Sequence, residues 1–456
     1  MKYTQKLAEF VEKKNFQDFP SEAIEQAKML MLDSLGCAIA GYTQAAEEVE
    51  WMVELAKKQC PSGNCTIICD GSKTCSSYAA MVNGGMVHTI DYDDTHMGSI
   101  VKFGSSQLGV SLALGEQYNL SGKDLITAFI LGVEAGGRVG RCIMPSHYIY
   151  WHPTGTTAGV GAGVAAAKLL KQNAEQIEQV IGHCADAAGG MRYCIVNGDF
   201  SKTLHPALAA MKAVMFAELV GSGANGPQGI LEYTYGFINA YSKDPNIEPL
   251  LDGLGEQYEI MEDSLKFYPT IQCSQTAISV ALELIKEHNI KAEDIEKIEL
   301  VHTATVPGQG CNPNPETLLA ARLSIPFCMA LCAYEGQVSL GQFTAEKLKD
   351  PVYVDFMRKV EITPSQELQT KYPETIASYM DIKCSGGKVY SGEQIYPKGD
   401  PRNRMSADEV KDKFRSLAAT TLPKEQVEDI IQAVFTLEDA DNIEHLIRKL
   451  KKDWVN

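Results

Sequence analysis

Apolar residues recur at steps of three and four positions through roughly the first 260 residues, the spacing that places them on one face of an α-helix. This pattern predicts helices over 21–40, where Gly41 stands at the position of a C-cap, and over 205–219. Ser121 and the aspartate three positions later predict a capping box that opens another helix. A further predicted helix, over 157–170, is dense in Gly and Ala, so a neighbouring helix could approach it closely.

The hydrophobic pattern changes after Glu262. Residues 296–306 and 389–396 have the β-branched, alternating character of strands flanked by turn residues. Residues 276–288 and 315–334 keep the helical spacing. Helices mixed with strands in this way predict an α+β region rather than a continuation of the helical one.

The end of the chain returns to helical spacing. Ser406, with Glu409 three positions on, predicts a second capping box after a loop rich in Gly, Pro and Asn. We therefore predict a mainly α fold made of a large helical domain, 1–262, with a smaller inserted α+β lid domain, 263–402. The last segment, 403–456, is predicted to rejoin the helical domain.

Composition narrows the class of protein. The 456 residues are 45% hydrophobic and 22% charged, as in a globular protein with a large core. A net charge of −17 repels polyanions, so we expect no nucleic-acid partner. The longest apolar candidate, 160–170, is too short for a membrane span, and the first residues lack the apolar region of a signal peptide. We expect a cytoplasmic protein that does not interact with membranes.

The 13 cysteines, without an export signal, are expected to be reduced thiols. Four of them crowd together at Cys60, Cys65, Cys69 and Cys75, but their spacing matches no zinc or iron–sulfur pattern. Residues 66–69 read as a short strand, which would point neighbouring thiols to opposite faces. No Gly-rich phosphate loop follows a predicted strand. We therefore predict neither a metal nor an organic cofactor.

Titratable residues are densest at 83–104, NGGMVHTIDYDDTHMGSIVKFG, where three carboxylates, two histidines and a lysine stand among glycines. Such a stretch can line a polar pocket, or it can be a solvated acidic loop, and composition does not separate the two. Asp93 and Asp94 could cap the local turn, and His96 could point away from Thr95. His88 lies on the helix that leads into this stretch and could be structural or functional.

The sequence motifs and their order along the chain decide between a polar pocket and a solvated acidic loop. DYDDTH after NGG-x-x-H closely resembles the hallmark of the MmgE/PrpD family. WHPTGTTAGVGAGVAAAKLL, SKTLHPALAA, GPQGILEYTYGF, LKFYP and PKGDPRNRMS resemble later family blocks and follow in family order across nearly the whole chain. The resemblance implies a mostly helical domain, an inserted α+β lid, a homodimer, and a reaction next to a carboxylate of a small polycarboxylate substrate.

The dehydratases, decarboxylases and epimerases of the family share one chemical problem. In each reaction, negative charge develops on a carbon next to a carboxylate. Cations must spread that charge, and an acid/base group must move a proton. The family's site residues fall on Asp91, Thr95, His152, Lys202 and Lys266. By their chemistry, the two lysines would bind carboxylates, the histidine would exchange the proton, and the aspartate would orient a cation or a hydroxyl.

Two further residues complete the predicted site. His205 follows Lys202 by three positions and is predicted to support substrate binding from the same helical face. Lys102 stands where the family usually has a histidine, and we predict it as catalytic, binding a carboxylate or, if desolvated, acting as a base.

Other departures limit the reaction that can be carried over. The histidine of decarboxylases falls on Ile271, that of dehydratases falls near Cys273, and a tyrosine of some decarboxylases falls on Phe327. We predict a cofactor-independent lyase acting next to a carboxylate of a small hydroxylated di- or tricarboxylic acid, similar to 2-methylcitrate dehydratase. The alternatives are an epimerase, isomerase or decarboxylase of a polycarboxylate, or a catalytically degenerate dimer that only binds carboxylates.

Overall fold

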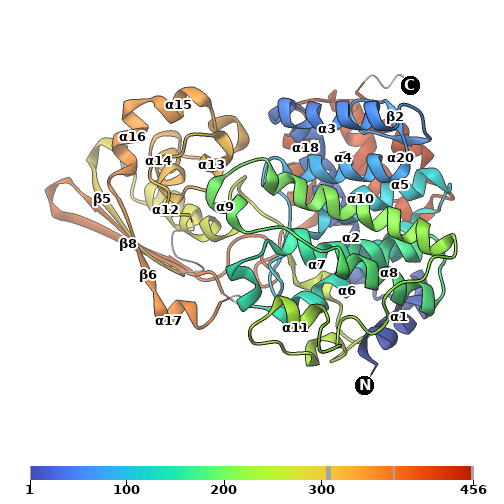
Figure 1. Cartoon of the computed structure of the whole chain (residues 1–456). Coiled ribbons are helices and arrows are strands. Elements are labelled where there is room, and N and C mark those ends of the chain that lie inside the picture. The colour runs from blue at the N-terminus through green and yellow to red at the C-terminus, as the bar shows by residue number, and fades with distance from the viewer. Residues whose placement is uncertain (1, 304–309, 373–374, 453–456) are drawn as a thin grey trace. The chain divides into compact units, whose positions relative to one another are not determined.

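The computed structural model describes residues 2–303, 310–372 and 375–452. The chain forms two compact units (Figure 1), which we call the helical unit and the mixed unit. The helical unit comprises Met1–Arg192, Thr203–Asp263 and Ser406–Asn456, and the mixed unit comprises Tyr193–Lys202 and Ser264–Met405. Most elements in both are helices, so the prediction of a mainly α protein is confirmed.

The helical unit is built from α-helices and very short strands. Its helices are α1 Tyr3–Lys13, α2 Ser21–Gln44, α3 Ala46–Gln59, α4 Ser76–His88, α5 Phe103–Gln117, α6 Gly122–Ile143, α7 Pro153–Leu169, α8 Ala174–Asp186, α10 Ser201–Gly221, α11 Phe237–Tyr241, α18 Ala407–Ala418, α19 Lys424–Phe435 and α20 Glu444–Lys449. The strands β1 Cys65–Thr66 and β2 Lys73–Thr74 form a small antiparallel hairpin, and β3 Thr95–His96 lies in the acidic motif. Both predicted capping boxes are confirmed, at the starts of α6 and α18.

The Gly- and Ala-rich helix packs as its composition predicts. A Cβ added at Gly161 of α7 would lie 2.4 Å from the carbonyl oxygen of Gly132 in α6, far inside van der Waals contact. The two helix backbones therefore touch, and a larger residue at this point would force them apart. The predicted start of this helix was late, because α7 begins at Pro153, whose fixed φ suits the first turn.

The predicted end of the first long helix was wrong. Helix α2 continues through Gly41 to Gln44. Gly41 does not cap the helix: a Cβ there would lie 2.4 Å from Thr89 Oγ1 and 2.5 Å from the carbonyl oxygen of Met86. The glycine is needed because the end of α4 approaches α2 closely. The requirement comes from tertiary packing, although a glycine at this position also fits the sequence pattern of a helix C-cap.

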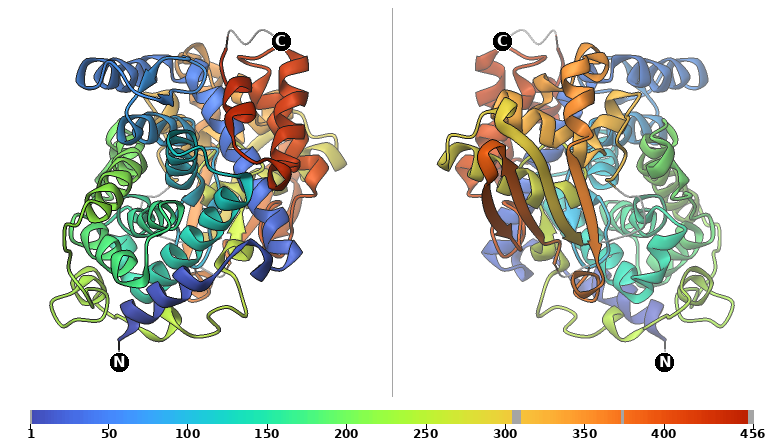
Figure 2. Two further views of the ribbon diagram at one scale, coloured as in Figure 1. Left: turned by 90° about the vertical axis from the view of Figure 1, so that its right-hand side faces the viewer. Right: turned by 90° about the vertical axis from the view of Figure 1, so that its left-hand side faces the viewer.

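The C-terminal helices pack on α2 within the helical unit, and Figure 2 shows them in red beside the blue N-terminal helices. Gly36 of α2 gives room for Phe414 and Leu417 of α18, which would lie 3.1 and 3.2 Å from an added Cβ. Lys413 of α18 forms an ion pair of 2.7 Å with Asp33 of α2. The last segment therefore contributes to the same core as the first.

The mixed unit contains a four-stranded sheet in the order β6-β5-β7-β8, which the right-hand view of Figure 2 shows. Its strands are β5 Ile295–Thr303, β6 Val360–Ser365, β7 Ser378–Cys384 and β8 Lys388–Gln394. Its helices are α9 Tyr193–Asn197, α12 Gln275–Glu287, α13 Leu318–Arg322, α14 Ile325–Glu335, α15 Ala345–Lys349, α16 Pro351–Met357 and α17 Gln366–Gln369. Strands β5 and β6 are parallel, and the other pairs are antiparallel.

Apolar residues of α12 and α14 form one core with the buried faces of β5 and β7. Buried and more exposed positions alternate along β7, as expected for a strand with one covered face. The helix predicted over 315–334 is two helices, because Ser324 caps α14 by accepting a hydrogen bond from the Phe327 N–H at 3.2 Å. Of the strand predicted over 296–306, positions 304–306 lie outside the described residues.

Candidate active site in the helical unit

The acidic motif begins where α4 ends. His88 is the last residue of α4, and its Nδ1 lies 2.7 Å from Asp93 Oδ2, with both side chains buried. Asp91 adopts a left-handed backbone with φ of 52° and is 1% exposed. Asparagine and aspartate tolerate this conformation better than most residues. The motif is therefore a tight, buried turn and not a solvated acidic loop.

Asp94 holds the start of α5. Its carboxylate accepts hydrogen bonds from the Phe103 and Gly104 N–H groups, at 2.8 and 2.9 Å. Burial and then the charge of Asp93 nevertheless raise the pKa of Asp94 to about 7. Asp263 makes a side-chain hydrogen bond with Asp94, and burial followed by this neighbour raises the pKa of Asp263 well above its usual value. Two ionised carboxylates cannot share a hydrogen bond, so this pair holds a proton.

Lys102 and His152 occupy equivalent positions on two helices. Lys102 is the N-cap residue of α5, and His152 is the N-cap residue of α7. The Lys102 N–H donates to Thr154 Oγ1 at 3.2 Å, which ties the two helix starts together. The Lys102 side chain is buried, and its charge acts to lower the pKa of Asp263. The structure therefore brings Lys102 to the same end of the helical unit as His152.

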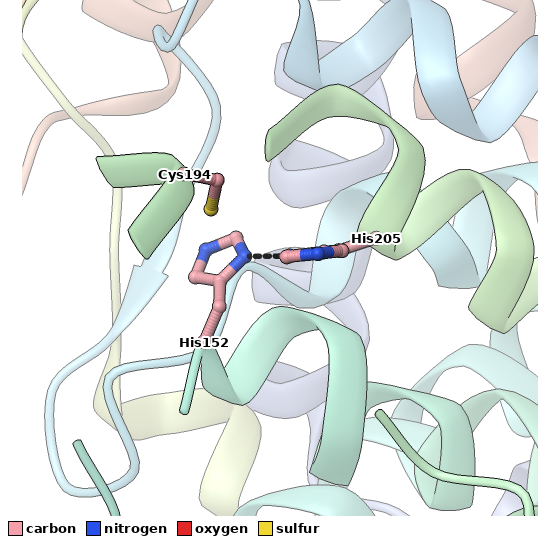
Figure 3. A group of neighbouring side chains, drawn as sticks. All are labelled: His152, Cys194 and His205. Carbon is pink, nitrogen blue, oxygen red and sulfur yellow. Dashed lines mark hydrogen bonds between the residues drawn. The ribbon is translucent and has the colours of Figure 1, made fainter. Parts of the chain in front are cut away.

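His152 and His205 form a pair of imidazoles (Figure 3). Their Nδ1 atoms lie 2.9 Å apart. One ring must donate and the other accept, so one proton lies between the two nitrogens. The His152 ring also stacks on His88, with centroids 5.7 Å apart. Three histidines from separate motifs therefore meet: His205 contacts His152 directly, and His88, left open by the sequence, stacks on it.

Glycines make room for this pair. A Cβ at Gly155, in the first turn of α7, would lie 2.4 Å from the carbonyl oxygen of Gly189 and 3.0 Å from His205 Cβ. Gly190 has φ of 137°, and its carbonyl oxygen accepts the His152 N–H at 2.9 Å. The WHPTG motif thus carries a glycine because the His205 side chain passes over that point of the helix.

Thr95 and His96 have local partners. Thr95 Oγ1 donates to the Asp94 carbonyl oxygen at 2.7 Å. His96 Nδ1 lies 2.7 Å from Ser99 Oγ, and its Nε2 lies 3.0 Å from Glu259 Oε2. Burial opposes ionisation of Glu259, but His96 and then Arg141 lower its pKa to about 2. Both ring nitrogens of His96 are therefore engaged in holding the loop, in agreement with a side chain turned away from Thr95.

Lys202 and Lys266 belong to the mixed unit, and both are buried. Ile271, Cys273 and Phe327 are also buried there. Phe327 packs in the apolar core of that unit, 5.8 Å from the ring of Phe343. The position of the decarboxylase tyrosine is thus filled by a core side chain without a hydroxyl.

One group of residues in the helical unit has the chemistry of a metal site. Ligand atoms of His88, Asp91 and Asp93 lie within 4.8 Å of one another, and all three side chains are buried. One imidazole and two carboxylates suit a divalent cation. A cation here would have to replace the hydrogen bond between His88 and Asp93, which already satisfies one nitrogen and one oxygen.

Sequence reasoning missed three residues around the motif: Asp33, Asp263 and Lys413. The Lys413 ammonium donates to the Tyr92 carbonyl oxygen at 2.9 Å and lies 3.8 Å from the centre of the Tyr92 ring, in addition to its ion pair with Asp33. Each is a single charged residue in an amphipathic or turn segment, where a solvated side chain is the usual outcome. No local signal could have identified them, because they meet only in the folded unit.

The Asp94–Asp263 pair predicts a pH dependence of stability. A raised pKa means that the folded protein binds more protons than the unfolded chain between about pH 3.9, the value of a free aspartate, and the folded value, about 7 for Asp94. Stability should therefore fall as pH rises through this window. Asp263→Asn keeps a donor to Asp94 and removes one titrating group. We expect its Tm to gain a few degrees on the wild type between about pH 5.5 and pH 8.

The measurement is thermal unfolding of both proteins across this pH range. Asp441→Asn, at an exposed loop position, is the control and should keep a constant difference from the wild type. If Asp263→Asn also kept a constant difference, the carboxyl pair would not share a proton.

These observations define a mainly helical protein of two units, with buried histidines and carboxylates gathered in its helical unit. The chain belongs to the MmgE/PrpD family: the MmgE/PrpD N-terminal domain matches residues 5–250, and the MmgE/PrpD C-terminal domain matches residues 268–439. The family resemblance found in the motifs is thereby confirmed.

Several characterised proteins are similar over almost their full length. Cis-aconitate decarboxylase of Aspergillus terreus is 26% identical over 95% of this chain and 92% of its own length. The mouse cis-aconitate decarboxylase is 26% identical over 94% of this chain and 89% of its own length. The cis-aconitate decarboxylase-like protein oryM of Aspergillus oryzae is 23% identical over 97% of this chain. These relatives support a lyase.

Proposed function

We propose that this protein is a cofactor-independent lyase that dehydrates a small hydroxylated di- or tricarboxylic acid, in the manner of a 2-methylcitrate dehydratase. The observation that carries the proposal is the His152–His205 pair, with 2.9 Å between the Nδ1 atoms. When the Nδ1 proton lies on His152, its Nε2 is free of a proton and can act as a base. When that Nε2 gains a proton, the neutral His205 ring stabilises the imidazolium without adding a charge.

Dehydration proceeds by loss of a proton next to a carboxylate and loss of hydroxide from the adjacent carbon. His152 removes the proton, and Asp91 and Thr95 orient the hydroxyl, which leaves as water with a proton from an acid. Lys102, Lys202 and Lys266 bind the carboxylates and spread the developing charge. Lys202 lies one helical turn before His205 on α10, which supports a shared site.

In this proposal the mixed unit acts as a lid, and the substrate is bound by residues that both units supply. His152 and Asp91 come from the helical unit, and Lys202 and Lys266 come from the mixed unit. Clefts between domains are common ligand sites, and closure of a lid excludes water from the reaction. An experimental structure with Lys266 more than about 15 Å from His152 would contradict a shared pocket, even after allowance for closure.

We also propose a homodimer, supported by an exposed apolar face on α10. Among the described residues, this helix alone is long and apolar enough to cross a membrane, and 44% of its most apolar window is buried. Leu208, Met215 and Leu219 lie on one face and are 40%, 42% and 47% exposed. Such a face is usually covered, and a second copy would cover it. Light scattering should give twice the mass of the chain.

Two other reactions remain as second candidates. Cis-aconitate decarboxylases are among the similar proteins, which makes decarboxylation a candidate, but Ile271 and Phe327 replace the polar residues that some decarboxylases carry at these positions. Epimerisation needs only the proton exchange that the histidine pair supplies. In a degenerate paralogue the same residues would bind carboxylates without turnover.

Proton NMR in deuterated water separates these outcomes, with citrate, methylcitrate, aconitate and aspartate-derived acids as the panel. An olefinic product from a hydroxy acid supports the proposal. Exchange of the α-proton for deuterium without net turnover identifies an epimerase, and loss of CO2 from aconitate identifies a decarboxylase. Binding without any change identifies the degenerate paralogue.

The same experiment in EDTA tests the group of His88, Asp91 and Asp93. We expect activity to be unchanged by the chelator. Loss of activity that a divalent metal restores would show that this group is a metal site.

A further inference from the structure

Two cysteines outside the candidate active site lie together at the junction of α3 and α4. Cys60 is the C-cap residue of α3, and Cys75 is the N-cap residue of α4. The two positions are held side by side, because Thr74 Oγ1 donates to the Cys60 carbonyl oxygen at 2.9 Å. A Cβ at Gly63 would lie 2.1 Å from the Thr74 carbonyl oxygen and 2.6 Å from the Cys75 nitrogen. The backbone at Gly63, after Cys60, therefore packs directly on the backbone at Thr74, before Cys75.

Exposure sets this pair apart from most other cysteines. All 13 lie within the described residues, and ten of them are buried. The three partly exposed ones are Cys60, Cys75 and Cys311. A soluble oxidant therefore reaches the Cys60–Cys75 pair and Cys311 before the core thiols.

The surroundings of Cys75 favour its thiolate. Burial acts to raise the pKa of Cys75, but interactions with Ser77, whose Oγ lies 3.5 Å from the Cys75 sulfur, with the Tyr78 backbone and with Cys60 outweigh it and lower the pKa below its usual value. An N-cap position adds the positive end of the helix dipole. By contrast, burial raises the pKa of Cys65 to about 12 and also raises the pKa of Cys311.

We propose that Cys60 and Cys75 form an oxidisable dithiol that peroxide converts reversibly into a disulfide. The Cys75 thiolate attacks one oxygen of hydrogen peroxide, the O–O bond breaks, and hydroxide leaves, which gives a sulfenic acid on Cys75. The Cys60 sulfur then attacks the Cys75 sulfur, the S–O bond breaks, and the oxygen leaves as water. Overall, two thiols lose two electrons and two protons, and one peroxide becomes two waters.

The bond would connect the ends of the β1–β2 hairpin. The Cys60 sulfur lies near enough to influence the Cys75 thiol, although its own proton is donated to the Ser62 carbonyl oxygen at 3.2 Å. The two sulfurs must close to about 2.05 Å, which side-chain rotation at two helix ends can provide. The site is independent of the proposed reaction, since it lies at the opposite end of α4 from His88. Any thiol reductant reverses the step by disulfide exchange.

The test is treatment of the reduced, folded protein with one equivalent of hydrogen peroxide, followed by alkylation and mass spectrometry. Trypsin cuts after Lys73, so Cys60 and Cys75 fall in separate peptides, 59–73 and 74–102. We expect a crosslinked pair of these peptides that dithiothreitol releases. Peptide 59–73 also contains Cys65 and Cys69, so fragmentation must place the bond on Cys60.

Serine variants separate the two roles. In Cys60→Ser, Cys75 should still be oxidised, and dimedone should trap its sulfenic acid without a crosslink. In Cys75→Ser, peroxide should leave Cys60 mostly reduced. Cys311→Ser is the matched control and should form the crosslink as the wild type does. Oxidation of Cys311 ahead of Cys75, or a crosslink that persists in Cys60→Ser, would overturn the proposal.

Discussion

Replacement of His152 by glutamine is expected to lower turnover by about 100- to 10,000-fold while substrate binding is retained, the usual range for a lost general acid/base. Glutamine can still hydrogen-bond to His205, but it cannot take up a proton near neutral pH. In the proposed mechanism the lysines supply most of the attraction for carboxylates, and this substitution leaves them unchanged. The measurement is the rate constant of a single turnover, and the Kd of the substrate is determined separately by calorimetry.

Two lysine variants serve as comparisons for this experiment. Lys202→Met should weaken both binding and turnover, because it removes a cation from the bound and the reacting substrate alike. Lys102→Met tests the alternative base. If His152→Gln kept near-normal turnover while Lys102→Met abolished it with binding intact, Lys102 would be the base, and the change from histidine to lysine would mark a change of mechanism within the family.

Gly155→Ala is expected to destabilise the protein by about 1–3 kcal/mol, the usual cost of overpacking. The new methyl group would lie 2.4 Å from the Gly189 carbonyl oxygen and 3.0 Å from His205 Cβ. The first contact is with a backbone oxygen, which can shift only at a substantial cost in free energy. The second contact would push His205 away from His152. We therefore expect a loss of turnover together with a lower Tm.

Gly159→Ala is the matched control, one turn further along the same helix. A Cβ there would lie 3.7 Å from its nearest neighbour, Ala209 Cβ, which is ordinary contact. The substitution should stabilise the helix by up to about 1 kcal/mol, because alanine has the higher helix propensity. Chemical denaturation should measure the free energy of unfolding of both variants, and steady-state kinetics should measure their turnover. Equal behaviour of the two would mean that the space around His205 is not restricted.

The local pattern determined much of the helical architecture. Helical spacing and two capping boxes placed α6 and α18 correctly, because these signals act within one or two turns. Position 41 shows the limit: glycine satisfies a C-cap and a close helix contact equally well, and only the packed structure reveals that Met86 and Thr89 need the space. The break at Ser324 was missed for a similar reason, since apolar spacing continues across it.

The motifs by themselves determined the family and the identity of His152, His205 and the acidic turn. Tertiary structure decided what these residues touch. Imidazoles 53 positions apart meet at 2.9 Å because α7 and α10 pack together through glycines. Asp94, Asp263 and the Asp33–Lys413 ion pair come together from distant segments, where each is an ordinary charged residue. The sequence alone determines residue type and local spacing. The pKa values of side chains and their hydrogen-bond and ion-pair partners depend on burial and on neighbours that only folding supplies.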